Sequence, residues 1–142
     1  MVVLDTDILS LVEWEMSAVS QKLRQRFSQY PPSEIHASII SFDEQMRGWT
    51  AYIGRAKNMS QEIQAYQRLR RQLKLYCKLP MVDFDEPAAV RYQSLRRQFR
   101  RLNANDLKIA SITLAHQATT LVSRNMRDFK LIPGLMVEDW TR

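Results

Sequence analysis

The amino-acid sequence predicts an α/β fold, with a mostly parallel sheet of four or five strands between two layers of helices. Short apolar runs alternate along the chain with longer segments of helical periodicity. Since parallel strands need long crossover connections, this alternation implies βαβ units. The 142 residues contain no repeat, low-complexity tract or linker and match the usual size of one domain. We therefore expect residues 1–142 to form a single three-layer α/β/α domain.

The chain begins with a predicted strand and a long helix. Val2–Leu4 is apolar and β-branched, which is typical of a buried strand. Asp5–Asp7 can turn the chain and cap a helix, because its side-chain oxygens accept the first free amide hydrogens. Apolar residues then recur at helical spacing from Leu9 to Leu23, and the helix is expected to end before Pro31.

A second strand and two more helices are expected next. Ile35–Ile40 is rich in β-branched residues and predicts a strand. Ser41 and Glu44 have the spacing of a capping box, which predicts a helix from Ser41 to about Lys57. A further helix is predicted over Gln61–Tyr76. Its apolar side chains share one face, namely Ile63, Tyr66, Leu69, Leu73 and Tyr76.

Two helices and up to three strands are predicted in the second half of the chain. Pro87 suits the first turn of a helix that ends near Leu102. The polar segment 103–106 opens another helix over Leu107–His116. The predicted strands are Met81–Phe84, Thr119–Ser123 and Leu135–Val137, of which the last would raise the number of strands from four to five.

The charge of the chain is unevenly distributed. With 21 basic and 15 acidic residues the net charge is +6. Residues 55–105 hold twelve basic and four acidic residues, or +8, whereas the rest of the chain holds nine and eleven, or −2. Fifteen of the 21 cations are arginines, whose guanidinium group binds phosphate in a bidentate manner. A basic middle therefore suits a polyanionic partner, although a solvated helix surface has the same composition.

Composition also excludes several classes of protein. The single cysteine, Cys77, cannot form an internal disulfide, and with only two histidines the chain cannot build a structural zinc site. No apolar run approaches the ~20 residues that cross a bilayer. The N-terminus lacks the pattern of a signal peptide. We therefore expect a cytoplasmic protein without a membrane partner.

Acidic and amide residues gather where the predicted strands end. Asp5 follows the first strand, Glu44 opens the helix after the second, and Asp106 opens the helix before the fourth. Asn125 and Asp128 follow that fourth strand. Ligands of open parallel sheets bind beyond the carboxyl ends of the strands, so these residues are expected to converge. Oxygen ligands suit Mg²⁺ or Mn²⁺, and a cation would relieve the repulsion between carboxylates.

Each of these residues also has a purely structural interpretation. Asp5 can form a turn, Glu44 can complete a capping box, and Asp106 can favour a helix N-terminus. Asn125 can cap a helix, and Asp128 can be an ordinary surface residue.

Several strings of this sequence resemble the PIN-domain ribonucleases, and more narrowly the VapC toxins of bacterial VapBC toxin–antitoxin pairs. The strings are VVLDTDILS, SFDEQMRG, NDLKIASITLAH, TLVSRNMRDF and PGLMVEDW, in order over nearly the whole chain. The resemblance implies a PIN fold and Mg²⁺- or Mn²⁺-dependent cleavage of RNA. It makes Asp5, Glu44 and Asp106 the first three acidic positions of the site, and Gly48 supports this register. The fourth position is Asn125, where many relatives have Asp, so the number of metal ions stays open.

The resemblance also implies roles for individual residues. Asp5 and Asp106 are the expected metal ligands, while Glu44 would hold metal or orient water and Asn125 would position either. Metal-activated water would leave a 5′-phosphate and a 3′-hydroxyl. The side chains expected to support this site are Thr6, Asp7, Ser123 and Asp128. The residues expected to bind the RNA backbone are Arg91, Arg96, Arg97, Arg100 and Arg101.

The partners implied by the resemblance are RNA, a second copy of the chain in a homodimer, and a small antitoxin. An apolar helical stripe is a candidate contact surface for such partners, although core packing explains most of it equally well. Trp14 is the member of this stripe least expected inside the monomer. The other members are Leu9, Leu11, Val12 and Met16.

Three other functions are compatible with parts of the sequence. In a haloacid-dehalogenase-like phosphatase, Asp5 would be the nucleophile and Asp7 the general acid–base. A metal-free ribonuclease could use His36 and His116 as acid and base. A non-catalytic RNA-binding module is supported by charge alone. The aromatic residues of the basic stretch could stack on unpaired bases, but at helical spacing they favour core packing, and they are Tyr66, Tyr76, Tyr92 and Phe99.

Overall fold

A parallel sheet forms the centre of the molecule. The computed structural model describes residues 1–14, 17–117 and 119–142. The strands are β1 (Val2–Leu4), β2 (Ile35–Ser38), β3 (Met81–Val82), β4 (Thr120–Val122) and β5 (Met136–Glu138). They pair in the order β3-β2-β1-β4-β5, and every neighbouring pair runs parallel. The predicted parallel sheet is therefore confirmed, with the fifth strand included.

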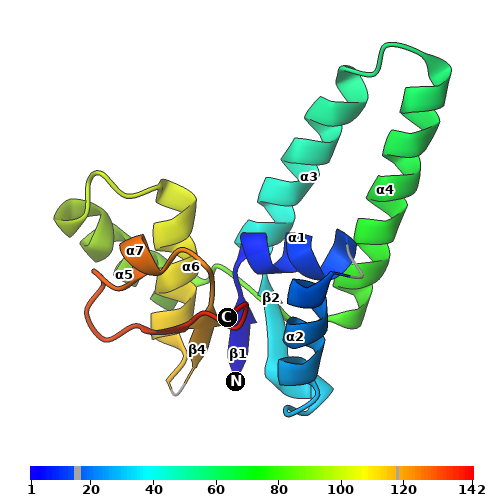
Figure 1. Ribbon diagram of the computed structural model, residues 1–142. Helices are drawn as coiled ribbons and strands as arrows, with labels where there is room; N and C mark the ends of the chain where they lie inside the picture. The colour runs from blue at the N-terminus through cyan, green and yellow to red at the C-terminus, as the bar shows by residue number, and fades with distance from the viewer. Residues whose placement is uncertain (15–16, 118) are drawn as a thin grey trace.

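Helices cover both faces of this sheet. They are α1 (Thr6–Trp14), α2 (Ala18–Phe27), α3 (Ile39–Gly54), α4 (Met59–Lys78), α5 (Glu86–Gln98), α6 (Ala104–Ala115) and α7 (Met126–Phe129), and a 3-10 turn, η1 (Pro32–Glu34), precedes β2. Val3 belongs to a buried cluster with residues of α5, α6 and α7. Val2 and Leu4 belong to a second cluster with residues of α1, α2 and α4, because successive strand side chains point to opposite faces. This three-layer arrangement confirms the predicted fold (Figure 1).

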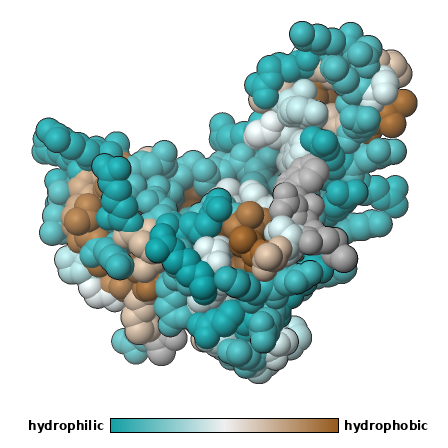
Figure 2. Space-filling view, in the orientation of Figure 1, coloured by the Kyte–Doolittle hydropathy of each residue, from teal (hydrophilic) through white to brown (hydrophobic). Residues whose placement is uncertain are grey.

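The hairpin of α3 and α4 projects well beyond the sheet (Figure 1). Its base is fixed where the Tyr76 hydroxyl donates to Gln45 Oε1 over 2.5 Å and Phe42 packs edge-on against the Tyr76 ring. Figure 2 shows the surface hollowed between this hairpin and the side that carries α5 and α6. Within the described part of the chain, no helix is long and apolar enough to cross a membrane.

The single helix predicted from Leu9 to Leu23 is wrong, because two helices, α1 and α2, occupy this segment. Ser17 caps the second helix, and its side chain accepts a hydrogen bond from the Ser20 amide over 3.1 Å. The apolar spacing continued across the break because Leu9 and Leu23 pack into the same buried cluster. Periodicity therefore identified the buried positions but not the interruption between them.

The start of α3 also differs from the prediction. The strand expected over Ile35–Ile40 ends at Ser38, whose side chain accepts from the Ser41 amide over 3.1 Å and caps a helix that begins at Ile39. Ser41 is thus a helical residue and not the cap. Glu44 lies in the second turn, too far along the helix to complete a capping box. The β-branched pair Ile39–Ile40 predicted strand locally, but the cap at Ser38 ends the strand.

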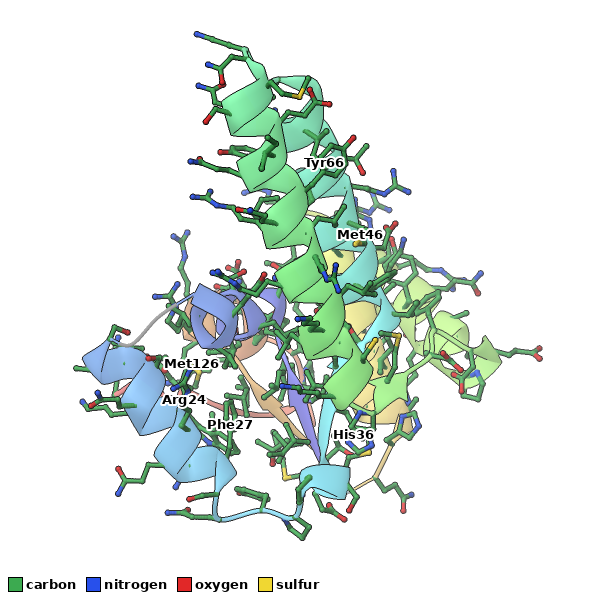
Figure 3. The ribbon with its side chains drawn as sticks, turned by 90° about the vertical axis from the view of Figure 1, so that its right-hand side faces the viewer. Arg24, Phe27, His36, Met46, Tyr66 and Met126 are labelled. Atoms are coloured by element: carbon green, nitrogen blue, oxygen red, sulfur yellow. The ribbon has the colours of Figure 1, made fainter. Side chains whose placement is uncertain are left out.

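The apolar face predicted for α4 is largely exposed. Ile63, Tyr66 and Leu73 each keep more than half of their surface accessible. Figure 3 shows Tyr66 on the projecting part of the hairpin, away from the sheet. Of the predicted face only Tyr76 is buried, and the other buried residues of α4 are Ala65 and Gln72. Of the other aromatic residues in the basic stretch, Tyr92 and Phe99 pack against the core, as the core interpretation expected.

The apolar stripe predicted on the first helix is only partly exposed. Leu9 is fully buried, while Leu11 and Val12 are partly buried against the same cluster. Met16 and the side chain of Trp14 lie outside the described part of the structure, so the predictions made for them stay predictions.

Candidate functional site

The polar residues predicted from the strand ends lie near one another in the structure. Asp5 directly follows β1, and Ser123 directly follows the neighbouring strand β4. Asp106 lies in the first turn of α6, which enters the same edge of the sheet (Figure 1). The carboxyl ends of parallel strands share one edge, which explains why residues distant in sequence come together here.

Asp5 is a buried carboxylate held by two hydrogen bonds. Its side chain is 5% exposed, and its oxygens accept from the Thr6 amide over 2.8 Å and from the Ser123 hydroxyl over 2.7 Å. Burial, together with the nearby charges of Asp7 and Asp106, raises the pKa of Asp5 to about 7. The bond from Ser123 acts in the opposite direction. The structure thus fixes the orientation of Asp5 while making its negative charge costly.

Thr6 connects Asp5 to α3. Its hydroxyl donates to Glu44 Oε1 over 2.9 Å and lies 2.9 Å from Ser41 Oγ. Glu44 therefore points toward the start of α1, not toward the cap of its own helix. Thr6 and Ser123 contact two of the acidic residues directly, which is the geometry of the supporting positions predicted for them.

Asp106 and Asn125 form the other side of the site. Asn103 caps α6, and its side-chain oxygen accepts from the Asp106 amide over 3.3 Å. Asn125 Nδ2 lies 3.4 Å from Asp106 Oδ2 and donates to Asp128 Oδ2 over 3.2 Å. Burial raises the pKa of Asp106, and with the charges of Glu44, Asp128 and Asp7 it brings the value to about 6. The neutral amide of Asn125 thus lies between two carboxylates that would otherwise repel each other.

Asp7 adds a further carboxylate at the margin. Its Oδ2 accepts from the Arg124 amide over 3.2 Å and lies 3.5 Å from the Arg124 side chain. Its Oδ1 is buried and has no hydrogen-bond partner among the described residues. A buried acceptor without a donor is costly, so a bound ligand that reached this oxygen would be stabilising.

The donor set fits a hard divalent cation. The functional side chains are all oxygen donors, and the charges of Asp5, Asp7 and Asp106 destabilise one another. Over the described ranges no group of three or more acidic, histidine or cysteine side chains is already gathered at metal-binding distance. The side chains, including the unpaired Asp7 Oδ1, therefore provide oxygen ligands of the type that such a cation prefers. They do not form a complete coordination shell.

The predicted RNA-binding arginines divide into two groups. Arg96, Arg97 and Arg100 line one depression along α5 and the segment that leads into the start of α6. Arg96 also donates to the Leu102 carbonyl over 2.8 Å and so helps to hold that segment. Arg101 continues the same surface with Arg97 and Arg100. Arg91 lies apart, in a depression shared with His116 and Gln117 at the opposite end of α6.

The two histidines make separate local contacts. His36 Nδ1 lies 3.1 Å from the Glu34 carbonyl, and His116 Nδ1 lies 3.0 Å from the Ile112 carbonyl. His36 sits near the base of the molecule in Figure 3, and His116 ends α6, whose first turn carries Asp106. The structure does not bring these rings together as the acid–base pair of a metal-free ribonuclease.

Sequence reasoning missed several polar residues beside this site. Gln45 donates to Ser10 Oγ over 2.9 Å, and Ser10 donates to the Thr6 carbonyl over 3.1 Å. The spacing from Thr6 to Ser10 along α1 was the only available signal, since Gln45 reaches them from another helix.

Comparisons with known proteins agree with this arrangement. The family model described as PIN domain matches residues 2–135. Over 69 residues the chain is 36% identical to "Ribonuclease VapC2" of Rickettsia felis, a match that spans 46% of this chain and 51% of that protein. The match thus extends over about half the length of this curated relative.

Solved structures match over nearly the full chain. The VapBC-1 structure from nontypeable Haemophilus influenzae has a TM-score of 0.79 at 23% identity, with 100% of both chains covered. The DNA-bound VapBC of Salmonella typhimurium gives 0.78 at 23% identity, covering 98% of this chain and 97% of that one. Rickettsia felis VapBC2 bound to promoter DNA gives 0.73 at 26% identity, covering 99% of each. With its fold shared by these structures and residues 2–135 matched by the PIN-domain model, the chain belongs to the PIN-domain family.

Proposed function

We propose that this protein is a divalent-metal-dependent endoribonuclease and the toxin of a VapBC-type toxin–antitoxin pair. The observation that carries the proposal is that Asp106 lies close enough to Asp5 and to Glu44 for their charges to interact, and that burial and this repulsion raise the pKa of Asp5 and Asp106. The ribonuclease named as a relative supports RNA as the substrate. A bound cation would turn the repulsion between these carboxylates into binding energy.

Asp5 and Asp106 would hold Mg²⁺ or Mn²⁺, and Asn125 and Glu44 would complete the surroundings of the ion. When bound, the metal supplies an acidified water and neutralises charge on the phosphate. Ser123 and the Thr6 amide hold Asp5 in one orientation, and Asn125 does the same for Asp106. Glu44, which accepts a hydrogen bond from Thr6, would orient the attacking water. Attack by water leaves a 5′-phosphate and a 3′-hydroxyl.

The arginines beside the start of α6 would bind the RNA backbone. Arg97, Arg100 and Arg101 are exposed and precede the helix that carries Asp106. A strand bound along them would pass the acidic site, because the segment 99–103 leads directly into α6. Arg96 would stabilise this surface from within through its bond to Leu102. Arg91, at the other end of α6, would contact RNA only beyond the cleavage point.

The proposal extends to the domain organisation of the chain, its cellular location and its protein partners. We expect residues 1–142 to fold as one domain and to act in the cytoplasm as a homodimer. The similar structures from Salmonella typhimurium, Rickettsia felis and Haemophilus influenzae are of VapBC, which supports a small antitoxin as the inhibitory partner.

The test compares wild type with Asp106→Asn on an unstructured RNA, with Mg²⁺, with Mn²⁺ and with EDTA. Cleavage should need the divalent ion and fall by about 100-fold or more in the variant, because a carboxylate ligand is lost. Asp83→Asn removes an exposed carboxylate elsewhere and should leave the rate unchanged. As a second readout, Mn²⁺ should raise the melting temperature of wild type but not of Asp106→Asn.

Other outcomes would assign the protein differently. Equal cleavage by wild type and Asp106→Asn would refute the proposed site. Tight RNA binding without cleavage under any of these ions would identify a non-catalytic RNA-binding module. The phosphatase alternative finds no support in the site, because Asp7, its general acid–base, is bonded to the Arg124 backbone.

A further inference from the structure

A second pocket lies one helical turn from the acidic site, between α1, α3 and α4. Its volume is about 310 Å³, which accommodates a nucleobase. Ser10 and Glu13 line it from α1, Gln45 and Trp49 from α3, and Gln72 from α4. None of these residues belongs to the proposed catalytic set.

The pocket is connected to the acidic site by hydrogen bonds. Gln45 Nε2 donates to Ser10 Oγ over 2.9 Å, and Ser10 donates to the Thr6 carbonyl over 3.1 Å. Thr6 in turn donates to Glu44. A group bound in the pocket would therefore lie beside the phosphate that the acidic site cleaves.

Buried acceptors without donors gather in the wall of this pocket. Gln72 is 1% exposed, and its Oε1 accepts no hydrogen bond from the described residues. Both carboxylate oxygens of Glu13 are buried and likewise lack a hydrogen-bond donor among those residues. Burial raises the pKa of Glu13 to about 7, which the charge of Arg71 opposes. Three acceptor atoms in one wall call for a ligand that brings several N–H donors.

The rest of the lining is aromatic and basic. Trp49 and Tyr52 pack edge to face with ring centroids 5.6 Å apart. The Arg68 guanidinium lies 5.8 Å from the Tyr52 centroid, and Arg55 also lines the pocket. Aromatic faces stack on unpaired bases, and arginines attract the phosphates that accompany them. Among the lining residues that the structure describes, two arginines stand against Glu13, and this excess of positive charge opposes the insertion of another basic side chain.

We propose that this pocket binds an unpaired guanine of the RNA substrate, with Glu13 as the residue that selects it. Guanine alone among the four bases presents two adjacent donors, N1–H and N2–H, on its pairing edge, and a carboxylate accepts both. Adenine, cytosine and uracil place an acceptor next to their donor, which a carboxylate repels. Because both Glu13 oxygens are buried, binding would require the side chain to rotate about its three rotatable bonds toward the base edge. This inference rests on the proposed ribonuclease function and adds a base preference to it.

Binding of GMP, IMP and AMP to the full chain, measured by calorimetry, tests the inference without requiring cleavage. IMP differs from GMP only by the absence of the 2-amino group. GMP should bind about tenfold more tightly than IMP, since one charge-assisted hydrogen bond is lost, and AMP should bind more weakly still. The wild-type comparison needs no substitution and so does not depend on the folding of a variant.

A matched pair of variants locates the effect. Glu13→Gln should abolish the difference between GMP and IMP, because an amide offers only one acceptor. Glu86→Gln makes the same chemical change at an exposed position and should preserve the difference. In cleavage assays, Glu13→Gln should lose a preference for guanosine near the cut, while its divalent-ion requirement stays unchanged.

The possible failures are distinguishable. Equal affinities for the three nucleotides, or no GMP binding at millimolar concentration, would overturn the guanine pocket. Preferential binding of agmatine that is lost in Glu13→Gln would overturn it in favour of a basic side chain of a protein partner. Asp106-dependent cleavage without base preference would refute the pocket and leave the proposed function intact. Selective GMP binding without cleavage would support the pocket and refute the proposed function.

Discussion

The carboxyl group of Asp5 accepts two hydrogen bonds, but burial makes its charged form unfavourable. Its folded-state pKa is about 7 against an ordinary value of 3.8, so the native state binds the proton more tightly than the unfolded chain does. The metal-free protein should therefore lose stability as the pH rises from about 4 through 7. Asp5 accordingly opposes folding at neutral pH unless a cation compensates for its charge.

Asp5→Asn should stabilise the metal-free protein at pH 8 and leave it nearly unchanged at pH 4. The variant removes the cost of burying a charge; its amide oxygen can accept from the Thr6 N–H, and its NH₂ group can donate to the Ser123 hydroxyl oxygen. We expect about 2 kcal/mol, or roughly 5 °C in melting temperature, at pH 8 in EDTA. Differential scanning fluorimetry at the two pH values measures this. A melting temperature lowered equally at both would show that the carboxylate has a structural role instead.

The residues at which helices begin set the geometry of the site. Ser38 begins α3, and the same helix presents Ser41 and Glu44 to Thr6. Because the first free amides of α3 depend on this one side chain, the cap also fixes where Glu44 projects.

Ser38→Ala should cost about 1 kcal/mol of unfolding free energy, since the Ser41 amide loses its acceptor inside the protein. Thr50→Ala is a suitable control on the same helix, because that exposed hydroxyl only donates back to the Met46 carbonyl. Urea denaturation followed by circular dichroism compares the two variants. Equal effects would mean that the Ser38 bond contributes nothing to the helix start.

The sequence predicts that most of the helices and strands exist. It does not predict the boundaries and buried faces that depend on neighbouring elements. Val2–Leu4 and the helix opened by residues 103–106 follow from local pattern and capping, and both are confirmed. The Ser-x-x-Glu pattern at Ser41 was misleading because Ser38 offered an earlier cap. On α4, periodicity identified an apolar face, but the packing of the hairpin buries Gln72 instead.

The residues of the site and of the pocket also divide into those that local sequence pattern predicts and those that depend on tertiary packing. Asp5, Asp106 and Asn125 could be found because strand ends and helix starts are readable from sequence. Glu13 and Gln72 could not, since a pocket between three helices depends on how the hairpin packs against α1.

At the scale of the whole molecule, the basic stretch 55–105 divides between two arms. One part lies on the α4 arm of the hairpin and the other on α5 and the segment after it, on opposite sides of the hollow (Figure 1). The acidic residues lie between them. RNA would thus meet positive charge on both walls and a metal-dependent site on the floor.

Arg100→Gln combined with Arg101→Gln should weaken RNA binding and make it less sensitive to salt. Each lost phosphate contact on single-stranded RNA lowers the slope of log affinity against log salt by about 0.7, so the pair should lower it by up to roughly 1.4. Fluorescence anisotropy over a salt series measures the slope. Lys22→Gln with Arg142→Gln removes the same charge elsewhere and should leave the slope unchanged; a reduction of the same size would indicate attraction by net charge alone.

The projecting hairpin of α3 and α4 should open locally from its tip. Tyr76 anchors its base through Gln45, whereas Met59, Ile63 and Tyr66, nearer the tip, are exposed. Amide protons should therefore exchange with solvent first near the tip, around residues 54–58, and progressively later toward the base, which hydrogen-exchange mass spectrometry would resolve. Tyr76→Phe should remove this gradient by releasing the base. In the wild-type protein a single phenolic hydroxyl would thus limit how far opening spreads from the tip toward the sheet.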